Sequence, residues 1–533
     1  MSRSLKNISI VSLATVISRF LGLARDILVT AIFGASALAS AFVTAFTLPN
    51  LFRRLLGEGA LTAALIPTLN DELAARRREG AFQIVNQVSS WLGLVTAAIV
   101  GGAMILLHLL ADSSLLSTWS NNPDLVQRWR TAAQLAVILF PYLLFICLAA
   151  GFSAALQTLG KFKAPALSPI WLNLAMIGSL AGAVWGLEIP TKSAQMTWLC
   201  GGVLVGGFLQ MWVPALALKQ AGWRPRWDLT LSPAVRSILL LMGPTVVGSA
   251  IYLINLAITR LIGLSLNDSA AAILNLATRL VELPIGVFAI AVTTVVFPLI
   301  SQHAAKADWS AMATAYRKGM RLILAINLPA AVGLLLLAGP IIRVLFERGA
   351  FEATDTQHMI PVLGVFALGL PIFAYVNLML RAFYAQKDTR TPVQAALLSF
   401  VLNVSLCLLL MGPFSTVGLA LASNIAVLAQ AVYLQYRLTA KRPELNFRPL
   451  LLDLSKIVVG SIAMGVVVYV GLMVMAGLDQ EGWGSALRLV ILIPAGAGTF
   501  AVSAYVLKLE GRDELRDLLM SKLRKSPESD VSV

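Results

Sequence analysis

Charged side chains interrupt the apolar segments of this chain, and most of them are arginines. The stretch from residue 18 to residue 67 is apolar enough for a bilayer, yet it contains Arg19, Arg25, Asp26, Arg53, Arg54 and Glu58. A later apolar stretch contains Arg279 and Glu282. A charged side chain at the bilayer centre costs about 2.5–3.5 kcal/mol on insertion scales. We therefore expect these residues to face a water-filled cavity, a partner charge or a bound anion.

The charges leave a positive excess. Three oppositely charged pairs share a helix face: Arg19 with Asp26, Arg54 with Glu58, and Arg279 with Glu282. Simple neutralisation is the alternative for each pair, and Arg25 could instead reach the headgroups from its span end. With Arg260 left out as a residue that points outward, five arginines oppose three acids, a net charge of +2. Arginine forks match phosphate oxygens, so a cationic cavity indicates an anionic, phosphate-bearing ligand.

Residues suited to catalysis or metal binding are scattered. The three cysteines, Cys147, Cys200 and Cys407, lie inside apolar segments, which favours neither disulfides nor a metal site. The histidines are far apart in sequence, and the chain has no nucleotide-binding motif or nucleophile–base constellation. We predict that the protein is not an enzyme and uses no cofactor.

Transmembrane helices must position these charges. The 533 residues are 58% hydrophobic and 13% charged, with a mean hydropathy of +0.81. Apolar runs of 18 or more residues recur, each long enough to span a bilayer. We predict an all-α polytopic membrane protein with about 14 transmembrane helices. The predicted spans are 8–33, 38–69, 86–110, 132–159, 165–188, 195–218, 237–262, 269–301, 319–342, 359–384, 392–412, 416–436, 452–476 and 486–507.

The distribution of Lys and Arg between the spans predicts the orientation. Alternate connections, together with both ends of the chain, hold 28 Lys and Arg residues, and the other connections hold 6. The positive-inside rule places the richer set, and both termini, in the cytoplasm. The net charge of +15 is explained by this topology, and we expect no nucleic acid partner.

Recurring prolines predict an internal duplication. Pro67 matches Pro298 at an offset of 231, Pro141 matches Pro371 at 230, and Pro165 matches Pro392 at 227. An even number of spans per repeat makes the repeats parallel, and such lobes enclose a central cavity and can rock for alternating access. We predict an N-lobe over 1–222, a C-lobe over 223–445, two extra helices over 446–508 and a cytoplasmic tail over 509–533, amphipathic and suited to anionic headgroups.

Several longer stretches resemble the MurJ (MviN) family of bacterial lipid II flippases, within the multidrug/oligosaccharidyl-lipid/polysaccharide exporter superfamily. The similarity runs from about residue 8 to the end of the last span. The stretches that carry it are SRFLGLARD at 18–26, LPNLFRRLLGEGA at 48–60, RLVELPIGVF at 279–288, FERGAF at 346–351 and AFYAQKDTRTP at 382–392.

The resemblance implies a flippase that moves lipid II, the undecaprenyl-diphosphate-linked peptidoglycan precursor, from the inner to the outer leaflet of the bacterial cytoplasmic membrane. It implies that the substrate is met by Arg19, Arg25, Asp26, Asn50, Arg53, Arg279 and Glu282, with Arg54 and Glu58 as supporting charges. It also implies a polyprenyl-tail groove on the last two spans. Membrane lipids are the other expected partners, and a monomer is the working prediction.

The chain departs from the family at two positions, and other functions stay open. Many relatives have acidic residues where this chain has Ser40 and Thr278, so we expect a more positive cavity here. Alternatives are a flippase for another polyprenyl-diphosphate-linked oligosaccharide, a cation-coupled drug exporter of the same superfamily, or a membrane scaffold. A drug exporter favours an acidic cavity, and a scaffold has no use for buried charge.

Overall fold

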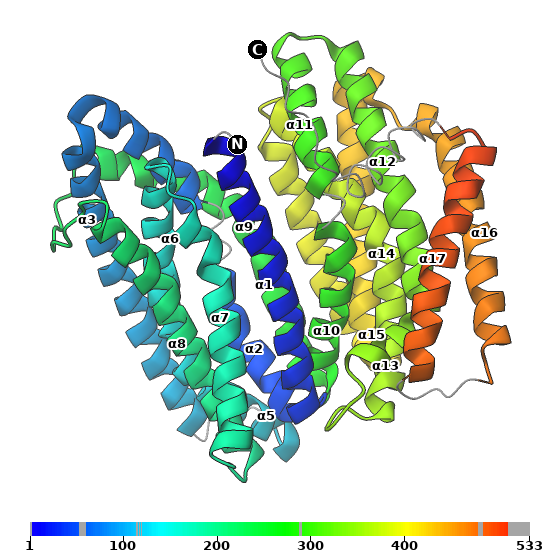
Figure 1. Ribbon diagram of the computed structural model, residues 1–533, viewed down its shortest axis with the longest axis horizontal. Coiled ribbons are helices and arrows are strands. Elements are labelled where there is room, and N and C mark those ends of the chain that lie inside the picture. The colour runs from blue at the N-terminus through cyan, green and yellow to red at the C-terminus, as the bar shows by residue number, and fades with distance from the viewer. Residues whose placement is uncertain are drawn as a thin grey trace, which may run out of the picture. The chain divides into compact units, whose positions relative to one another are not determined.

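The computed structural model describes residues 3–52, 60–112, 116, 118, 120–286, 290–477 and 483–509. Throughout these residues every regular element is a helix, which confirms the predicted all-α class (Figure 1). The tail at 510–533 lies outside the described residues. Eight described helices are long and apolar enough to cross a membrane, or nine when α5 (Pro123–Leu139) and α6 (Tyr142–Thr158), bent by 42° at their junction, form one span. The predicted multi-pass architecture is confirmed, and the count of about 14 spans stays a prediction.

The 52-residue element α15 (Arg390–Lys441) shows how one long element can hold two spans. Ser415 interrupts it with a φ of 50°, in the left-handed region. Tyr433 donates to Gln394 at 3.0 Å, and Ser423 donates to Asn403 at 3.2 Å. In each pair, one residue precedes Ser415 and the other follows it by a similar number of positions. The chain therefore folds back at Ser415, and α15 is a hairpin of two antiparallel helices. Its arms correspond to the predicted spans 392–412 and 416–436.

The first compact unit comprises residues 1–273 and 346–355. Its helices are α1 (Arg3–Phe33), α2 (Ala37–Phe52), α3 (Ala60–Asp112), α5, α6, α7 (Lys163–Ala181) with the π-helical turn η2 (Gly182–Gly186), α8 (Lys192–Lys219) and α9 (Pro233–Leu266). Glycines bring α7 and α8 into close contact. A Cβ on Gly206 would lie 2.8 Å from the Cα of Leu172, and one on Gly202 would lie 2.5 Å from the Cβ of Ser179. Small residues allow this approach because packing, not the hydrophobic effect, holds helices together in lipid.

An extended segment over residues 223–232 fixes the start of α9. Asn86 of α3 accepts hydrogen bonds from the Trp223 indole at 2.8 Å and from the Arg226 backbone N–H at 3.2 Å. Ser232 then caps α9 by accepting from the Val235 N–H. α9 packs against α2, α3 and α5. The first helix of the predicted C-lobe thus packs with helices of the predicted N-lobe, and the lobe boundaries remain a prediction.

A loop from the second half of the chain also belongs to the first unit. Residues 346–355 dock on the turn between α1 and α2, where the Ala350 N–H donates to the Ala31 carbonyl at 2.7 Å. Gly349 and Gly34 both have a φ of 62°, and a Cβ on Gly349 would lie 2.2 Å from the Ala31 oxygen. Glycine is required here both by the backbone conformation and by the close approach.

The second compact unit comprises residues 274–345 and 356–533. It contains most of α10 (Ala270–Pro284), then α11 (Ile290–Ala305), α12 (Trp309–Leu336), α13 (Ala338–Leu345), α14 (Ala353–Ala385), α15, two 3₁₀ turns η4 (Pro443–Leu445) and η5 (Arg448–Leu450), α16 (Leu451–Val474) and α17 (Trp483–Val506). Its core gathers Tyr316, Met320, Phe383 and their neighbours from α11, α12, α14 and α15. The α16–α17 pair is attached to α12 by an ion pair of 2.6 Å between Arg321 and Asp453.

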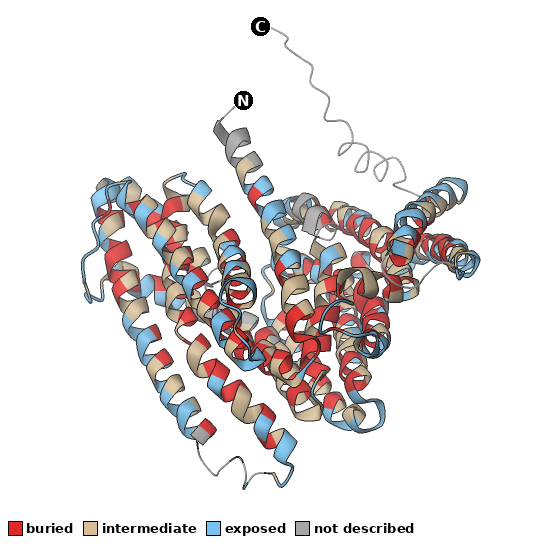
Figure 2. Ribbon diagram, turned by 60° about the horizontal axis from the view of Figure 1, so that its bottom comes forward, coloured by how far each residue is buried: buried red, intermediate tan, exposed pale blue. Residues whose placement is uncertain are grey.

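Burial differs strongly between helices of this unit. In the apolar 18-residue stretch of each helix, 61% of the residues are buried in α14 but only 11% in α17. Buried and exposed residues alternate along many of the helices (Figure 2). A helix that packs on one side only, and is apolar on the other, suits contact with lipid.

Two turns have the geometry that the duplication predicts. The Lys161 N–H donates to the Leu156 carbonyl, and the Asp388 N–H donates to the Phe383 carbonyl. These donors, and their acceptors, are both 227 residues apart, the offset of Pro165 and Pro392. Gly160 and Lys387, at the same offset, have φ values of 71° and 58°. In both cases a helix ends in a left-handed residue and the next helix begins just before the proline.

Candidate functional site

Arg25 on α1 is held in a buried polar contact within the first unit. Only 8% of the residue is exposed. Its Nε and Nη2 donate to Oδ1 of Asp26 at 2.9 and 2.6 Å, and its Nη1 donates to Oδ1 of Asn173 on α7 at 3.0 Å. Met176 Sδ lies 3.9 Å from the same Nη1. The guanidinium is thus oriented by acceptors on two helices.

Asn173 connects this arginine to the backbone of α1. Its Nδ2 donates to the Ser18 carbonyl at 3.1 Å while its Oδ1 accepts from Arg25. A Cβ on Gly22 would lie 3.7 Å from Asn173 Nδ2, an ordinary van der Waals distance, so the amide packs directly against this position of α1. The sequence analysis did not identify Asn173 as a site residue, because one amide on an apolar helix gives no signal of this role.

The structure gives Arg25 partners that the sequence did not predict. Arg25 packs against α7 instead of extending to the headgroups, so the snorkelling alternative is wrong for this residue. Asp26 accepts from the adjacent Arg25, a contact that the pairing with Arg19 did not anticipate. Arg19 is exposed on the same helix.

The second group of predicted residues follows α2. Asn50 lies in the last turn of α2 and is half-buried. Arg53, Arg54 and Glu58 fall outside the described residues. Their predicted roles stay predictions.

Arg260 of α9 was expected to point outward, and this expectation is wrong. The side chain is half-buried, and its Nη1 donates to Oγ1 of Thr47 on α2 at 2.7 Å. Thr47 is 3% exposed and lies two residues before Pro49. The sequence around Arg260 is apolar and does not indicate which helix covers this residue. For that reason it was expected to face lipid. Arg260 therefore joins the intramembrane arginines of the first unit.

Arg279 and Glu282 lie on α10, in the second unit. Both are half-buried, and they are three residues apart on one helix face as predicted. Thr278 donates to the Leu274 carbonyl of its own helix at 2.7 Å. The contribution of Arg279 and Glu282 to substrate binding stays a prediction.

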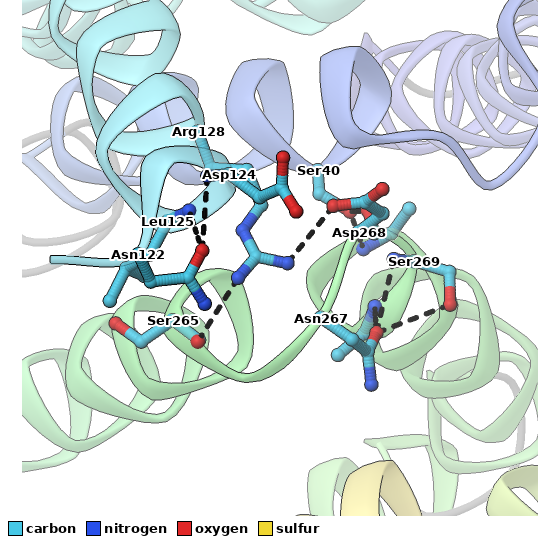
Figure 3. Close-up of polar contacts among 11 residues, drawn as sticks. Ser40, Asn122, Asp124, Leu125, Arg128, Ser265, Asn267, Asp268 and Ser269 are labelled. Atoms are coloured by element: carbon cyan, nitrogen blue, oxygen red, sulfur yellow. Dashed lines mark hydrogen bonds and ion pairs between the residues drawn. The ribbon is translucent and has the colours of Figure 1, made fainter.

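A polar cluster at the α9–α10 connection explains Ser40 (Figure 3). Ser40 is fully buried on α2, and its hydroxyl donates to the Asp268 carbonyl at 2.6 Å and accepts from the Ala272 N–H at 3.2 Å. Arg128 of α5 pairs with the Asp268 carboxylate at 2.9 Å. Ser40 thus caps the start of α10, so its surroundings do not support the expectation that it alters the charge of a cavity. The Arg128–Asp268 pair was missed because the two residues are 140 positions apart.

Among the described residues, no three His, Cys, Asp or Glu residues form a group that could hold a metal ion. Asn403, on the first arm of α15, is 1% exposed, and its Oδ1 accepts from Ser423 and from the Cys407 thiol. The contact with Ser423 joins the two arms of the hairpin.

Comparisons with known proteins agree on one family. The family model described as "Lipid II flippase MurJ" matches residues 29–479. A protein from Haemophilus influenzae named "Probable lipid II flippase MurJ" is 32% identical over 467 residues, covering 85% of this chain and 90% of its own. One from Rhizobium tropici with the same name is 34% identical over 430 residues, covering 79% and 78%.

Solved structures show the same relationship. A structure titled "Lipid II flippase MurJ, inward closed conformation" matches with a TM-score of 0.76 and 25% identity, covering 95% of this chain and 99% of its own. An inward-facing transporter of the multidrug resistance MATE family matches with a TM-score of 0.62 at 15% identity, covering 81% and 98%, which shows a shared fold.

Proposed function

Because the chain belongs to the MurJ family of lipid II flippases, we propose that its intramembrane arginines bind the diphosphate of lipid II during transfer across the membrane. The protein is a multi-pass transporter and not an enzyme, and its function is that of a lipid II flippase. The residues that meet the lipid, the direction of transfer and its driving force are the proposed part.

The buried guanidinium of Arg25 is the observation that carries the proposal. Asp26 and Asn173 hold it in a fixed orientation within a predicted span. A guanidinium has five N–H donors, and the hydrogen bonds to Asp26 and Asn173 use three of them. A diphosphate offers more acceptor oxygens and more negative charge than one carboxylate, so it can compete with Asp26 for this fork. Arg19, Asn50, Arg53, Arg279 and Glu282 complete the proposed substrate-binding set, supported by Arg54 and Glu58.

The exposed apolar side chains of α16 and α17 suit the polyprenyl tail. Val470 and Val474 on α16 are 51% and 80% exposed, and Val490 on α17 is 70% exposed. The two helices pack against each other and lie side by side in Figure 1. A paired apolar surface of this kind can hold a long isoprenoid chain along the membrane normal.

We place the protein in the bacterial cytoplasmic membrane, where it acts as a monomer among membrane lipids. The charge distribution along the chain places both termini in the cytoplasm. Single cysteines introduced at Lys306 and Lys387 should then react only with cytoplasmic reagent, and one at Asp355 only from outside. Reaction of the Lys387→Cys protein from outside in intact cells would contradict this orientation.

The membrane potential is the proposed driving force. Moving a lipid with about two negative charges outward gains roughly 2.3 kcal/mol per charge per 100 mV if the charge crosses the whole field. The predicted spans 237–262 and 392–412 contain no Asp or Glu for a cation site, and offer Asn255, Ser399 and Asn403 instead. Flipping measured in vesicles should follow the potential at fixed sodium. Activity that follows sodium at zero potential would refute this.

The substrate-binding role is tested by complementation of a strain depleted of its own flippase. Arg25→Ala and Arg279→Ala should each abolish growth and trap lipid II in the inner leaflet, while membrane fractions still contain the protein. Arg236→Ala, at an exposed position near the start of α9, removes the same charge and should support growth. Normal growth and lipid II export with both of the first two variants would contradict the proposal. Accumulation of another polyprenyl-diphosphate lipid in their place would favour the alternative substrate.

A further inference from the structure

A basic pocket lies at the turn between α14 and α15, and its lining contains none of the residues proposed to bind lipid II. Its volume is about 490 Å³, and its lining includes Lys387, Asp388, Arg390, Thr391, Arg437 and Lys441. All of these residues belong to the second unit. The lining contains four basic side chains and one acidic side chain, a net charge of +3. A pocket of this size and charge suits a small anionic group.

Asp388 organises the pocket rather than neutralising it. Its Oδ1 accepts from the backbone N–H groups of Arg390 and Thr391 at 3.1 and 3.0 Å. Its Oδ2 accepts from the Thr391 hydroxyl at 2.9 Å and from Lys441 Nζ at 3.0 Å. The carboxylate therefore fixes the first turn of α15 and holds Lys441 at the rim of the pocket. Lys387, Arg390 and Arg437 remain exposed.

Gln386 also lines the pocket. Oε1 of Gln386 is buried and has no hydrogen-bond partner, although its Nε2 donates to the Ala382 carbonyl at 3.1 Å. Arg437 lies over the Tyr433 ring at 5.9 Å, which limits where its guanidinium can go. The basic side chains of the lining can donate hydrogen bonds to the phosphate oxygens of a ligand.

The surroundings indicate where such a ligand comes from. The pocket lies where α14 ends and both arms of the α15 hairpin meet the predicted cytoplasmic surface of the membrane. Exposed apolar side chains continue from it along α15: Leu397 is 51% exposed, Val432 63% and Tyr436 70%. A basic site bordered by apolar surface at a membrane interface is the arrangement that fits a lipid headgroup with its acyl chains beside it.

We propose that this pocket binds the phosphodiester headgroup of an anionic phospholipid in the cytoplasmic leaflet. Lysines and arginines at a membrane surface are attracted to anionic lipids, and the fork of Arg390 or Arg437 can hold two phosphate oxygens. The headgroup of a glycerophospholipid fits 490 Å³, whereas a disaccharide-pentapeptide does not.

Native mass spectrometry of the full-length protein in a non-ionic detergent tests the proposal. The probes are dioctanoyl phosphatidylglycerol, dioctanoyl phosphatidylcholine and inorganic phosphate, added at equal concentrations. Each basic residue near an anionic lipid surface contributes about fivefold in affinity, so Arg390→Gln with Arg437→Gln should weaken phosphatidylglycerol binding about 30-fold. Lys219→Gln with Arg224→Gln removes the same charge from exposed positions predicted to lie on the same side of the membrane, and should leave binding unchanged.

Three results would overturn the proposal. They are equal binding of the two lipids, equal loss with the control variant, and displacement of phosphatidylglycerol by inorganic phosphate at the same concentration, which would identify a soluble ligand. If the double variant unfolds, Lys387→Gln replaces it, with an expected weakening of about fivefold. Because the readout is lipid binding and not lipid II transfer, failure here leaves the proposed flippase function untouched.

Discussion

The contact between Arg25 and Asn173 gives a prediction that separates charge from geometry. Arg25→Lys keeps the positive charge but replaces the planar fork by a single ammonium. The native guanidinium reaches Asp26 at 2.6 and 2.9 Å and Asn173 at 3.0 Å from three different N–H groups. An ammonium on a flexible stem cannot reproduce this arrangement, and either Asn173 or Asp26 loses its donor.

The expected cost follows from the burial of these groups. A hydrogen bond to a charged group contributes about 1.5–3 kcal/mol in soluble proteins, and polar pairs between membrane helices average about 0.6 and reach about 1.7 kcal/mol. With Arg25 only 8% exposed, we expect Arg25→Lys and Asn173→Leu each to lower the free energy of unfolding by about 1–2 kcal/mol. Because both variants lose one shared contact, the double variant should cost about 1 kcal/mol less than the sum of the single variants.

The assay is unfolding in SDS, followed with a thiol-reactive dye. Cys407, which is buried in the second unit, is replaced by Ser in all the proteins compared. Cys147 and Cys200 are free and fully buried in the first unit, so they react only when that unit opens. Arg224→Lys, at an exposed position of the same unit, is the matched control and should unfold like the native protein. Strictly additive costs, or an Arg25→Lys protein as stable as the native one, would refute the idea that the fork joins α1 to α7.

Two further outcomes follow from the backbone and from titration. Gly349→Ala places a Cβ 2.2 Å from the Ala31 oxygen at a φ of 62°, so limited proteolysis should cut the 346–355 loop faster. The control is Gly160→Ala, which also has a positive φ but whose Cβ would lie in open space. Equal protection of the loop in both variants would contradict the docking. Burial raises the pKa of Asp388, but hydrogen bonds from Thr391 and Lys441 outweigh it and lower the pKa below its usual value of 3.8. Stability from this group is therefore complete above pH 3.8 and is lost as the pH falls through the lowered pKa. The melting temperature of Asp388→Asn should approach that of the native protein only in that acid range, and a difference that stays constant as the pH falls through that range would contradict the assignment.

The amino-acid sequence by itself determined the class of the protein and the residues worth testing. Long apolar runs require helices in lipid, because the backbone must satisfy its own hydrogen bonds there. Charges inside those runs are costly unless they face a cavity or a partner, so Arg25 and Arg279 stand out without a structure. The proline offsets predicted an internal duplication, and the turns at Gly160 and Lys387, which precede two of these prolines at the same offset, share a left-handed residue.

Only the tertiary structure decided what each charge contacts. The cost of burying an arginine in lipid shows that the side chain needs a partner or a cavity. It does not show which helix supplies that partner. That Arg25 is held by Asn173, that Arg260 donates to Thr47, and that Ser40 caps α10 depends on contacts between residues roughly 150 to 230 positions apart. The same holds for the pocket at the α14–α15 turn, where Arg437 and Lys441 join residues 386–391 because α15 folds back at Ser415. Local sequence patterns record periodicity and cost, whereas the packing of distant helices determines which side chains meet.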